Sequence, residues 1–310
     1  MFLLLLQPII QEPIFYMRQF LSFLLFTFSI TTIFGQTTLQ YTLKIGDVFR
    51  VKQNAHQTII QELDGSSHEI INQMNGILEF KVVGIKEENY IINLTFKDLN
   101  LKMTSSIQGE LMNVKAKQVV PGDMQSSIFN SILNSPVKMT LSRNGDILEV
   151  KGGDALVTKM TAASGMEDEF SLKMMKKSLA KEFGSEALSN SYKQMTYIYP
   201  TKKIKVGDTW QNEYVGKLAA TTTWTLKSLT PKTATITGKA IVTMNVVEPA
   251  STMKLSGTQN TTITTNRSTG FISKMNVEGL TKGASVMAQM SDQKIPTTIK
   301  SKVTYELINE

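Results

Sequence analysis

The chain has 310 residues, a formal net charge of +7 and no cysteine. The lack of cysteine excludes a disulfide framework and a lipid anchor attached to a cysteine. The positive charge comes almost entirely from lysine. Nucleic-acid-binding proteins favour arginine for bidentate base and phosphate contacts, so the composition argues against a nucleic-acid partner.

Residues 1–35 predict a signal peptide. Met17-Arg18 precedes an apolar run over residues 20–34, and we expect cleavage after Gly35. Residues 1–16 are interpreted as an upstream extension. The run is shorter than the roughly 20 residues of a membrane span, and an uncleaved anchor is the alternative. The mature protein is therefore predicted to be periplasmic or secreted in a Gram-negative cell, with no lipoprotein anchor and no transmembrane span.

A short motif occurs twice and divides the mature chain. Residues 42–49 and 203–210 both contain the pattern apolar-Lys-apolar-Gly-Asp-x-aromatic. Glycine reaches positive φ without a Cβ clash, and aspartate accepts hydrogen bonds from nearby backbone, so each motif predicts a structural turn that opens a β unit. The turn residues are Gly46, Asp47, Gly207 and Asp208. We therefore predict two related β halves, residues 36–152 and 201–310, separated by a helical insert at residues 153–200.

The first half contains the clearest strand signals. Asp64-Gly65 predicts a two-residue hairpin turn in which paired residue numbers sum to 129. Further on, the apolar parity changes between Phe96 and Leu99, which predicts a β-bulge near Lys97-Asp98. Asp123 is expected to cap a short helix after the next strand.

The insert has helical periodicity and several end signals. Ser164 and Glu167 predict a capping box at the start of the longest helix, and Gly184 predicts its end. Ser185 and Asp154 are expected to cap the helices on either side of it.

In the second half, alternating strands end in a hairpin whose turn contains Gly270. No Pro/Ser-rich linker separates the halves, so we expect them to form one domain. The predicted fold class is α+β: a large, curved, mostly antiparallel sheet with the helical insert packed on one face.

The sequence offers little for catalysis. His56 and His68 are the only histidines. The predicted hairpin register places His68 opposite Gln61, about 17 Å from His56 at strand rise, so they cannot share a metal. The common serine-hydrolase, nucleotide and zinc motifs are absent, and no cofactor or metal is predicted. Asp47 and Asp208 could suggest a two-half carboxylate dyad, but Gly precedes Asp, in the opposite order to the aspartic-protease motif.

Methionine is abundant, with 17 residues, and methionine-rich surfaces adapt to varied apolar partners. We interpret several large apolar residues as core or as the wall of a lipophilic pocket, two roles that the sequence does not separate. These candidates are Phe129, Leu172, Met175, Leu179, Phe183 and Trp224.

The paired turns, together with the segment Asn266-Arg267-Ser268-Thr269-Gly270-Phe271-Ile272, resemble uncharacterised secreted envelope proteins that are grouped as a domain of unknown function. This resemblance covers essentially the mature chain and implies no catalytic residues. The expected architecture is also similar to that of periplasmic lipoprotein carriers, which is an analogy of architecture alone.

Three functions follow as hypotheses. The first is a non-enzymatic periplasmic or secreted binding protein for a lipid, an acyl chain or an apolar protein segment. The second is a structural or interaction protein of the envelope, with a filled core and a partner protein. The third is a carboxylate-based hydrolase, for which the sequence supplies no acidic pair in a cleft.

Overall fold

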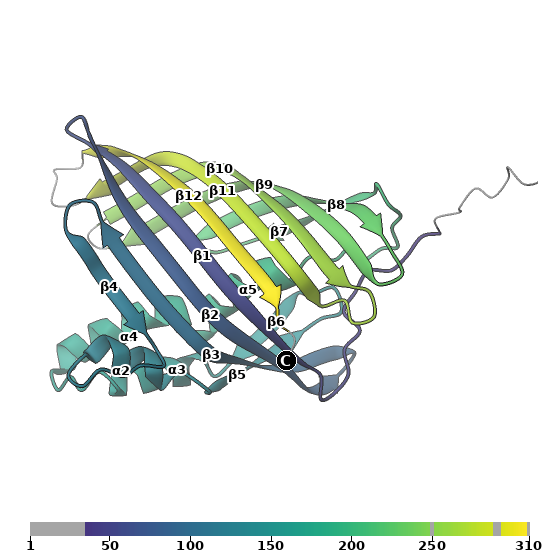
Figure 1. Ribbon diagram of the computed structural model, residues 1–310, viewed down its shortest axis with the longest axis horizontal. Helices are drawn as coiled ribbons and strands as arrows, with labels where there is room; N and C mark the ends of the chain where they lie inside the picture. The colour runs from purple at the N-terminus through teal and green to yellow at the C-terminus, as the bar shows by residue number, and fades with distance from the viewer. Residues whose placement is uncertain (1–34, 249–250, 288–292, 309–310) are drawn as a thin grey trace, which may run out of the picture. The chain divides into compact units, whose positions relative to one another are not determined.

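The computed structural model describes residues 35–248, 251–287 and 293–308, and residues Thr37–Glu310 form one compact unit. In this unit, one antiparallel sheet of 12 strands curves around the helices (Figure 1). The predicted α+β class with a large antiparallel sheet is therefore confirmed. The predicted signal segment before residue 35 lies outside the described residues.

The first and last strands of the chain, β1 and β12, lie side by side in the middle of the sheet, and β6 and β7 form its edges. Its strand order is β6-β5-β3-β2-β1-β12-β11-β10-β9-β8-β7, and β4 pairs with β3 beside this path. The first six strands are β1 (Val48–Leu63), β2 (Ser66–Lys86), β3 (Asn89–Ser105), β4 (Gly109–Lys115), β5 (Pro136–Leu141) and β6 (Ile147–Lys151). The other six are β7 (Thr209–Tyr214), β8 (Leu218–Leu229), β9 (Thr233–Glu248), β10 (Ser251–Asn266), β11 (Ile272–Met287) and β12 (Lys294–Leu307). Along the chain, the strands run from β1 outwards to β6 at one edge, and then from β7 at the other edge back to β12. The two halves of the sheet therefore meet where β1 pairs with β12.

Two details of register confirm the sequence patterns. Asp64-Gly65 closes the β1–β2 hairpin, and Gln61 lies opposite His68. In the β2–β3 pair, Leu78 lies opposite Phe96 while Ile77 lies opposite Asp98, so the intervening Lys97 is the extra residue of a bulge. The bulge allows Phe96 and Leu99 to be buried together although they are an odd number of residues apart.

The two copies of the Gly-Asp turn make the same contacts. The backbone N–H of Lys44 donates to the Asp47 carboxylate at 2.8 Å, and that of Lys205 donates to Asp208 at 3.0 Å. The glycine N–H of each turn also bonds a carbonyl of the second strand that follows, at 2.9 Å for Gly46 and 2.8 Å for Gly207. Both glycines have positive φ, 97° and 94°. Each turn therefore anchors the start of a hairpin to its own second strand.

The helices are α2 (Met124–Ser131), α3 (Gly153–Ala162), α4 (Glu169–Phe183) and α5 (Ser185–Thr196). Asp123 caps α2, as predicted, by accepting from the N–H groups of Gln125 and Ser126. The predicted capping box at Ser164 and Glu167 is wrong, because Asp168 caps α4 by accepting from Ser171 N–H at 2.7 Å.

The predicted caps of the flanking helices are also wrong. Glycines occupy both positions, Gly152 before α3 and Gly184 before α5. Ser185 has a tertiary role instead, because its hydroxyl accepts from Gly153 N–H at 3.2 Å and ties the two helix starts together.

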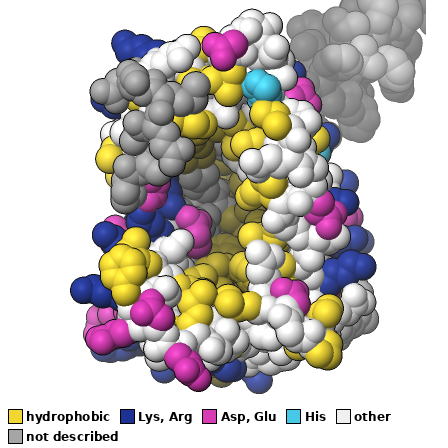
Figure 2. All heavy atoms as spheres, turned by 90° about the vertical axis from the view of Figure 1, so that its left-hand side faces the viewer, with side chains coloured by type: hydrophobic (Ala, Val, Ile, Leu, Met, Phe, Trp, Pro, Cys, Tyr) yellow, Lys and Arg dark blue, Asp and Glu magenta, His cyan; other side chains and the backbone are white. Residues whose placement is uncertain are grey.

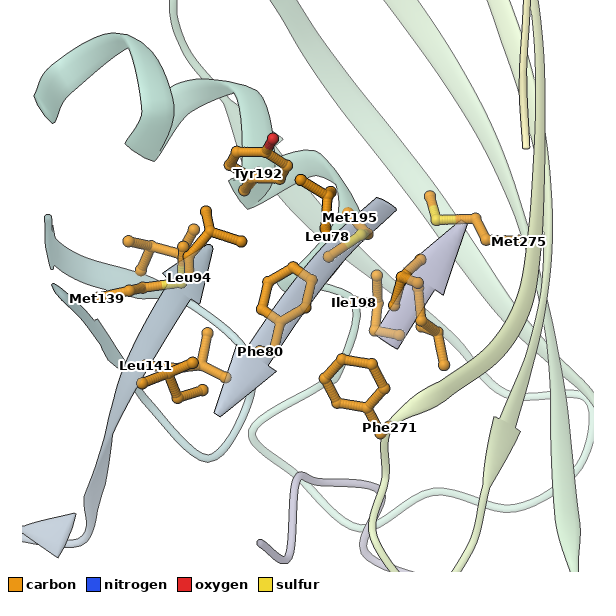
Figure 3. Packing of buried hydrophobic residues seen from close by; sticks show 14 of the residues in the cluster. Leu78, Phe80, Leu94, Met139, Leu141, Tyr192, Met195, Ile198, Phe271 and Met275 are labelled. Carbon is orange, nitrogen blue, oxygen red and sulfur yellow. The ribbon is translucent and has the colours of Figure 1, made fainter. Parts of the chain in front are cut away.

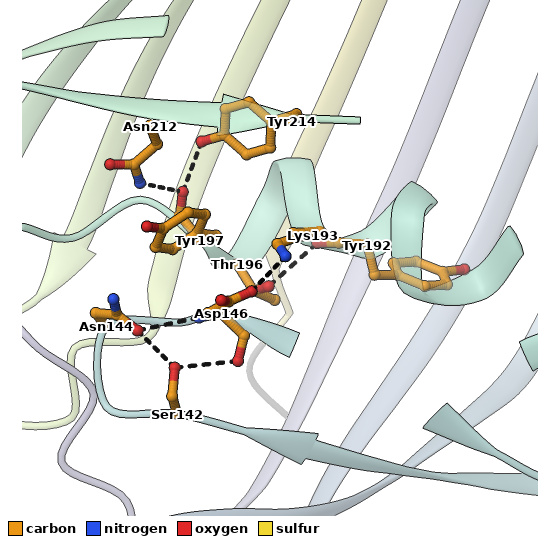
Figure 4. A network of polar contacts seen from close by, with 9 residues as sticks. All are labelled: Ser142, Asn144, Asp146, Tyr192, Lys193, Thr196, Tyr197, Asn212 and Tyr214. Atoms are coloured by element: carbon orange, nitrogen blue, oxygen red, sulfur yellow. Dashed lines mark hydrogen bonds and ion pairs between the residues drawn. The ribbon is translucent and has the colours of Figure 1, made fainter. Parts of the chain in front are cut away.

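Helix α5 connects the two edges of the sheet. On one side, Lys193 forms an ion pair with Asp146 at 2.6 Å, in the turn that leads into β6 (Figure 4). On the other side, the carbonyl of Tyr197, directly after α5, accepts from Asn212 at 2.8 Å and from the Tyr214 hydroxyl at 2.6 Å, both on β7. The gap between β6 and β7 is thus bridged by a helix and its following turn.

The core lies on the concave side of the sheet and contains residues of both halves. Phe271 of the second half stacks on Phe49 at a centroid distance of 4.0 Å and meets Phe80 edge-on at 5.6 Å. Tyr192 of α5 approaches Phe80 from the other side at 6.3 Å. Met195 and Ile198 are buried beside them (Figure 3). Helix α5 is therefore part of the core that the sheet encloses.

Candidate functional site

A cavity lies on the concave face of the sheet, beside α5. Its volume is about 200 Å³, and its walls come from β1, β8, β9, β10, β11, β12 and α5. Because strand side chains alternate between faces, the lining residues recur at every second position. Apolar lining residues include Met195, Val242, Met244, Met275, Ile299 and Val303. We call this space the inner cavity. In another protein, an engineered dry apolar cavity of about 150 Å³ binds benzene. The inner cavity is larger, so it has room for a small ligand.

Seven polar side chains also line the inner cavity: Gln57, Ser191, Gln194, Gln259, Thr281, Ser301 and Tyr305. Gln57 accepts a hydrogen bond from the Asn72 amide at 3.1 Å, which leaves its own amide hydrogens available to donate. Tyr305 accepts from the Gln53 amide at 3.5 Å, so its hydroxyl hydrogen is likewise available. These uncharged groups supply hydrogen-bond donors to an otherwise apolar space.

Burial affects the chemistry of Tyr305. Removal from water disfavours the phenolate and raises the pKa of Tyr305 to about 12. The hydroxyl is therefore neutral throughout the physiological pH range and acts as a hydrogen-bond donor.

Thr281 differs from the other buried hydroxyls on this face. Towards the ends of the same strands, Ser285 accepts from Gln61 at 2.9 Å and lies 2.9 Å from the Thr297 hydroxyl, which donates to Ile295 O. Thr281 is 6% exposed, and its hydroxyl makes no hydrogen bond. A buried polar group without a partner costs about 1–3 kcal/mol, so this hydroxyl is a candidate ligand contact.

A second, wider hollow adjoins the inner cavity. It has a volume of about 520 Å³ and lies between the end of α4, α5 and the loop before β8. It shares Ser191, Gln194 and Leu218 with the inner cavity, so the two are neighbours. We call it the outer cleft. Figure 2, seen from the left-hand side of Figure 1, shows that the molecule is hollowed on this side and that hydrophobic side chains line the hollow.

Two ion pairs involve lysines that line the outer cleft. Lys181 of α4 contacts Glu248 at the end of β9, and this hydrogen bond lowers the pKa of Glu248. Lys217 contacts Glu182 at 2.5 Å. Both lysines that line the cleft are therefore already paired with carboxylates.

The six sequence-predicted pocket residues lie outside the inner cavity lining. Phe183 of α4 packs against Phe129 of α2 at 6.1 Å and against Phe96 of β3 at 6.2 Å. Leu172, Met175 and Leu179 are half-buried on the same helix. Trp224 is buried in β8. The structure thus brings Phe129 and Phe183 together where α2 meets α4, and places Trp224 separately in β8.

The predicted turn residues are also remote from the inner cavity and the outer cleft. Asp47 and Asp208 each bond the backbone of their own turn, and neither lines either hollow. Gly270 has a φ of 71°, and an added Cβ there would lie 2.1 Å from the carbonyl oxygen of Gln40.

Sequence reasoning missed the polar lining of the inner cavity. A signal was present in β1, where Gln53, Gln57 and Gln61 recur at every fourth position on the face that also carries Val51. Polar residues on a buried strand face need partners, so this periodicity could have indicated a polar site inside the fold.

No group of three or more His, Asp or Glu side chains that could hold a metal occurs among the described residues. None of the helices in the described ranges has the length and hydrophobicity needed to cross a bilayer.

Comparison with known proteins gives a family but no activity. The model of DUF6263, a family of unknown function, matches residues 87–272. No curated protein matches the sequence significantly.

Among solved structures, lipovitellin, in a study of lipid–protein interactions, is 11% identical with a TM-score of 0.49. That match covers 86% of this chain and 26% of the lipovitellin chain, so this chain spans about a quarter of it. An outer membrane channel from Pseudomonas putida F1 is 8% identical with a TM-score of 0.24, covering 86% of this chain and 97% of the channel. TM-scores this low support no inference about what the chain binds.

Proposed function

The chain belongs to DUF6263, a family of unknown function, and from its geometry we propose that it is a non-enzymatic binding protein for a lipophilic ligand. The inner cavity is the observation that carries this proposal. Ligand pockets are concave and mainly apolar, with a few convergent polar groups, and the inner cavity has this composition. With the outer cleft beside it, the space is large enough for a chain-like molecule.

Uptake of the uncharged fluorescent probe N-phenyl-1-naphthylamine tests the proposal. We expect the probe's fluorescence to rise on addition of the purified protein, because the probe leaves water for the inner cavity. Val303→Trp should abolish the rise by filling the cavity, since Val303 lines it. The matched control is Val247→Trp, at a side chain 68% exposed on the same sheet. Absence of uptake by the unsubstituted protein, together with no co-purified lipid in native mass spectrometry, would reject the proposal.

An envelope structural or interaction protein is the second candidate. Ile241 and Val247 of β9 are 72% and 68% exposed, and exposed apolar side chains on a sheet can serve as a contact surface. A cross-linked partner that is lost in the Ile241→Lys variant, with no ligand uptake, would favour this function. A hydrolase has less support, because none of the described residues that line the inner cavity is Asp or Glu.

The remaining expectations are proposals of the same kind. We propose that the protein is periplasmic or secreted after cleavage near Gly35, which N-terminal sequencing of the mature protein and cell fractionation would test.

We also propose that the β halves are structural repeats, supported by the matching contacts of their turns. Exchanging Lys44–Asp47 with Lys205–Asp208 should then change the free energy of unfolding by less than about 0.5 kcal/mol.

A further inference from the structure

The described residues that line the inner cavity are uncharged. None of them is Lys, Arg, His, Asp or Glu, although the whole chain carries a net charge of +7. An ionised group buried without a partner loses its hydration and gains no compensating charge. The lining therefore disfavours a buried carboxylate or ammonium group in a ligand.

The neighbouring cleft does not supply a free counter-charge either. Its lysines, Lys181 and Lys217, contact Glu248 and Glu182. The carboxylates that line the cleft, Glu182 and Glu186, balance the two lysines in number. An anionic headgroup placed there would have to compete with existing ion pairs.

Three side chains of the inner cavity have donor hydrogens for which the described residues provide no acceptor. The Thr281 hydroxyl has no partner, and the Gln57 amide and Tyr305 hydroxyl have donor hydrogens to spare because each already accepts a bond through its oxygen. Thr281 and Gln57 come from β11 and β1, on either side of β12, which carries Tyr305. Thr281 and Gln57 lie opposite Ile299 and Ser301 of β12, whereas Tyr305 lies four residues beyond Ser301, about 13 Å away at strand rise. The lining therefore offers donors at separate levels along the strands, and a ligand oxygen could accept at any one of them.

We propose that the inner cavity binds an uncharged amphiphile, with its apolar chain against the methionines and branched aliphatic side chains and an ester or hydroxyl oxygen accepting from Thr281, Gln57 or Tyr305. This inference rests on the proposed lipophilic binding function and specifies its ligand class. A protein with this specificity would differ from proteins that bind ionised fatty acids or anionic lipid headgroups.

Competition for the fluorescent probe tests the ligand class. The competitors share a twelve-carbon chain: 1-lauroylglycerol is uncharged, and laurate at pH 8 is anionic. Both are used at concentrations at which they remain monomeric. We expect 1-lauroylglycerol to displace the probe at concentrations at least about tenfold lower than laurate, because only laurate must bury a charge. Equal or better displacement by laurate would overturn the inference.

Thr281→Val tests the hydrogen bond separately, since it removes the hydroxyl at nearly constant volume. It should weaken binding of 1-lauroylglycerol about three- to tenfold, as calculated from displacement with the variant's own affinity for the probe measured first. The matched control is Thr261→Val, at a buried threonine of β10 that does not line the cavity. Unchanged 1-lauroylglycerol binding in Thr281→Val would count against a role for this hydroxyl and overturn the inference as stated. Failure of the unsubstituted protein to bind the probe would instead reject the binding function itself.

Discussion

Gly270 lies where two backbone segments almost touch. Its φ is 71°, and an added Cβ would come 2.1 Å from the Gln40 carbonyl oxygen. The Tyr199 hydroxyl also donates to the Gly270 carbonyl at 2.5 Å. We expect Gly270→Ala to lower the free energy of unfolding by more than about 2 kcal/mol, because strain at positive φ adds to a steric clash. Urea denaturation measures this change.

A second glycine provides the control for Gly270. Gly109 has a φ of 74°, and an added Cβ would meet nothing within 4 Å. Gly109→Ala should therefore show only the conformational penalty, about 1 kcal/mol. Similar losses in the two variants would contradict the close approach at Gly270.

Asp208 is expected to stabilise its turn. Its carboxylate accepts from Lys205 N–H at 3.0 Å, so Asp208→Ala leaves this donor to water. By analogy with the loss of a helix N-cap, we expect a decrease of about 0.5–2 kcal/mol in unfolding free energy and a lower melting temperature. Asp208→Asn, which keeps an acceptor oxygen, should retain most of the stability. An unchanged melting temperature with loss of an activity would point to a chemical role instead.

Buried tyrosines predict sensitivity to alkaline pH. Burial raises the pKa of Tyr305 to about 12 from an ordinary value of 10.0, and it also raises the pKa of Tyr192 and Tyr199. The folded state thus favours the neutral phenol. The contribution of these tyrosines to the free energy of unfolding is complete below pH 10, and it is lost as the pH rises through their folded-state pKa.

Urea unfolding at a series of pH values between about 9 and 11.5 measures this loss. Tyr305→Phe cannot ionise at this position, so its stability should fall less steeply with pH than that of the unsubstituted protein. Parallel pH profiles would show that Tyr305 does not contribute.

At the scale of elements, the helices differ in how firmly they are held. Helix α4 has no buried side chain, and Phe170 in its first turn is 73% exposed. Helix α5 buries Leu188, Tyr192 and Met195. We expect the amides of α4 to exchange with solvent at least about a hundredfold faster than those of α5, because few apolar contacts oppose local opening. Hydrogen exchange with mass spectrometry resolves the two segments, and equal protection would contradict the prediction.

The elements also show what sequence patterns can determine. The β1–β2 register and the bulge at Lys97 were predictable, because a period of two leaves each apolar residue only one face on which to be buried. The caps of α3, α4 and α5 were not, because several polar residues near each helix start could accept the same hydrogen bonds. At the start of α5 a tertiary contact replaces the predicted cap, because the Ser185 hydroxyl bonds Gly153 of another helix.

The inner cavity was beyond prediction for a related reason. Its walls combine strands from both halves with α5, and the pairing of β1 with β12 joins segments about 250 residues apart. Local pattern carries no information about such a pairing. The sequence therefore indicated an apolar interior and pointed to α4, whereas the inner cavity lies beside α5.

For the whole molecule, the shared core predicts cooperative unfolding. Phe49 and Phe271 come from different halves and stack at 4.0 Å. Trp210 and Trp224 both lie in the second half, so their fluorescence reports on that half, while circular dichroism at 222 nm reports on helices and strands throughout the chain. We expect both signals to change at the same urea concentration. Separate transitions would indicate that the halves and the insert unfold independently.

The bridge formed by α5 between β6 and β7 also bears on how this architecture can change. In a closed barrel, diameter follows from strand number and shear, so resizing it requires new strand pairing. Here the sheet edges are held apart by a helix, through Lys193 on one side and Tyr197 on the other. Substitutions at Met195, a side chain of that helix that lines the inner cavity, would therefore change the width of the cavity while every hydrogen-bonded ladder stays as it is.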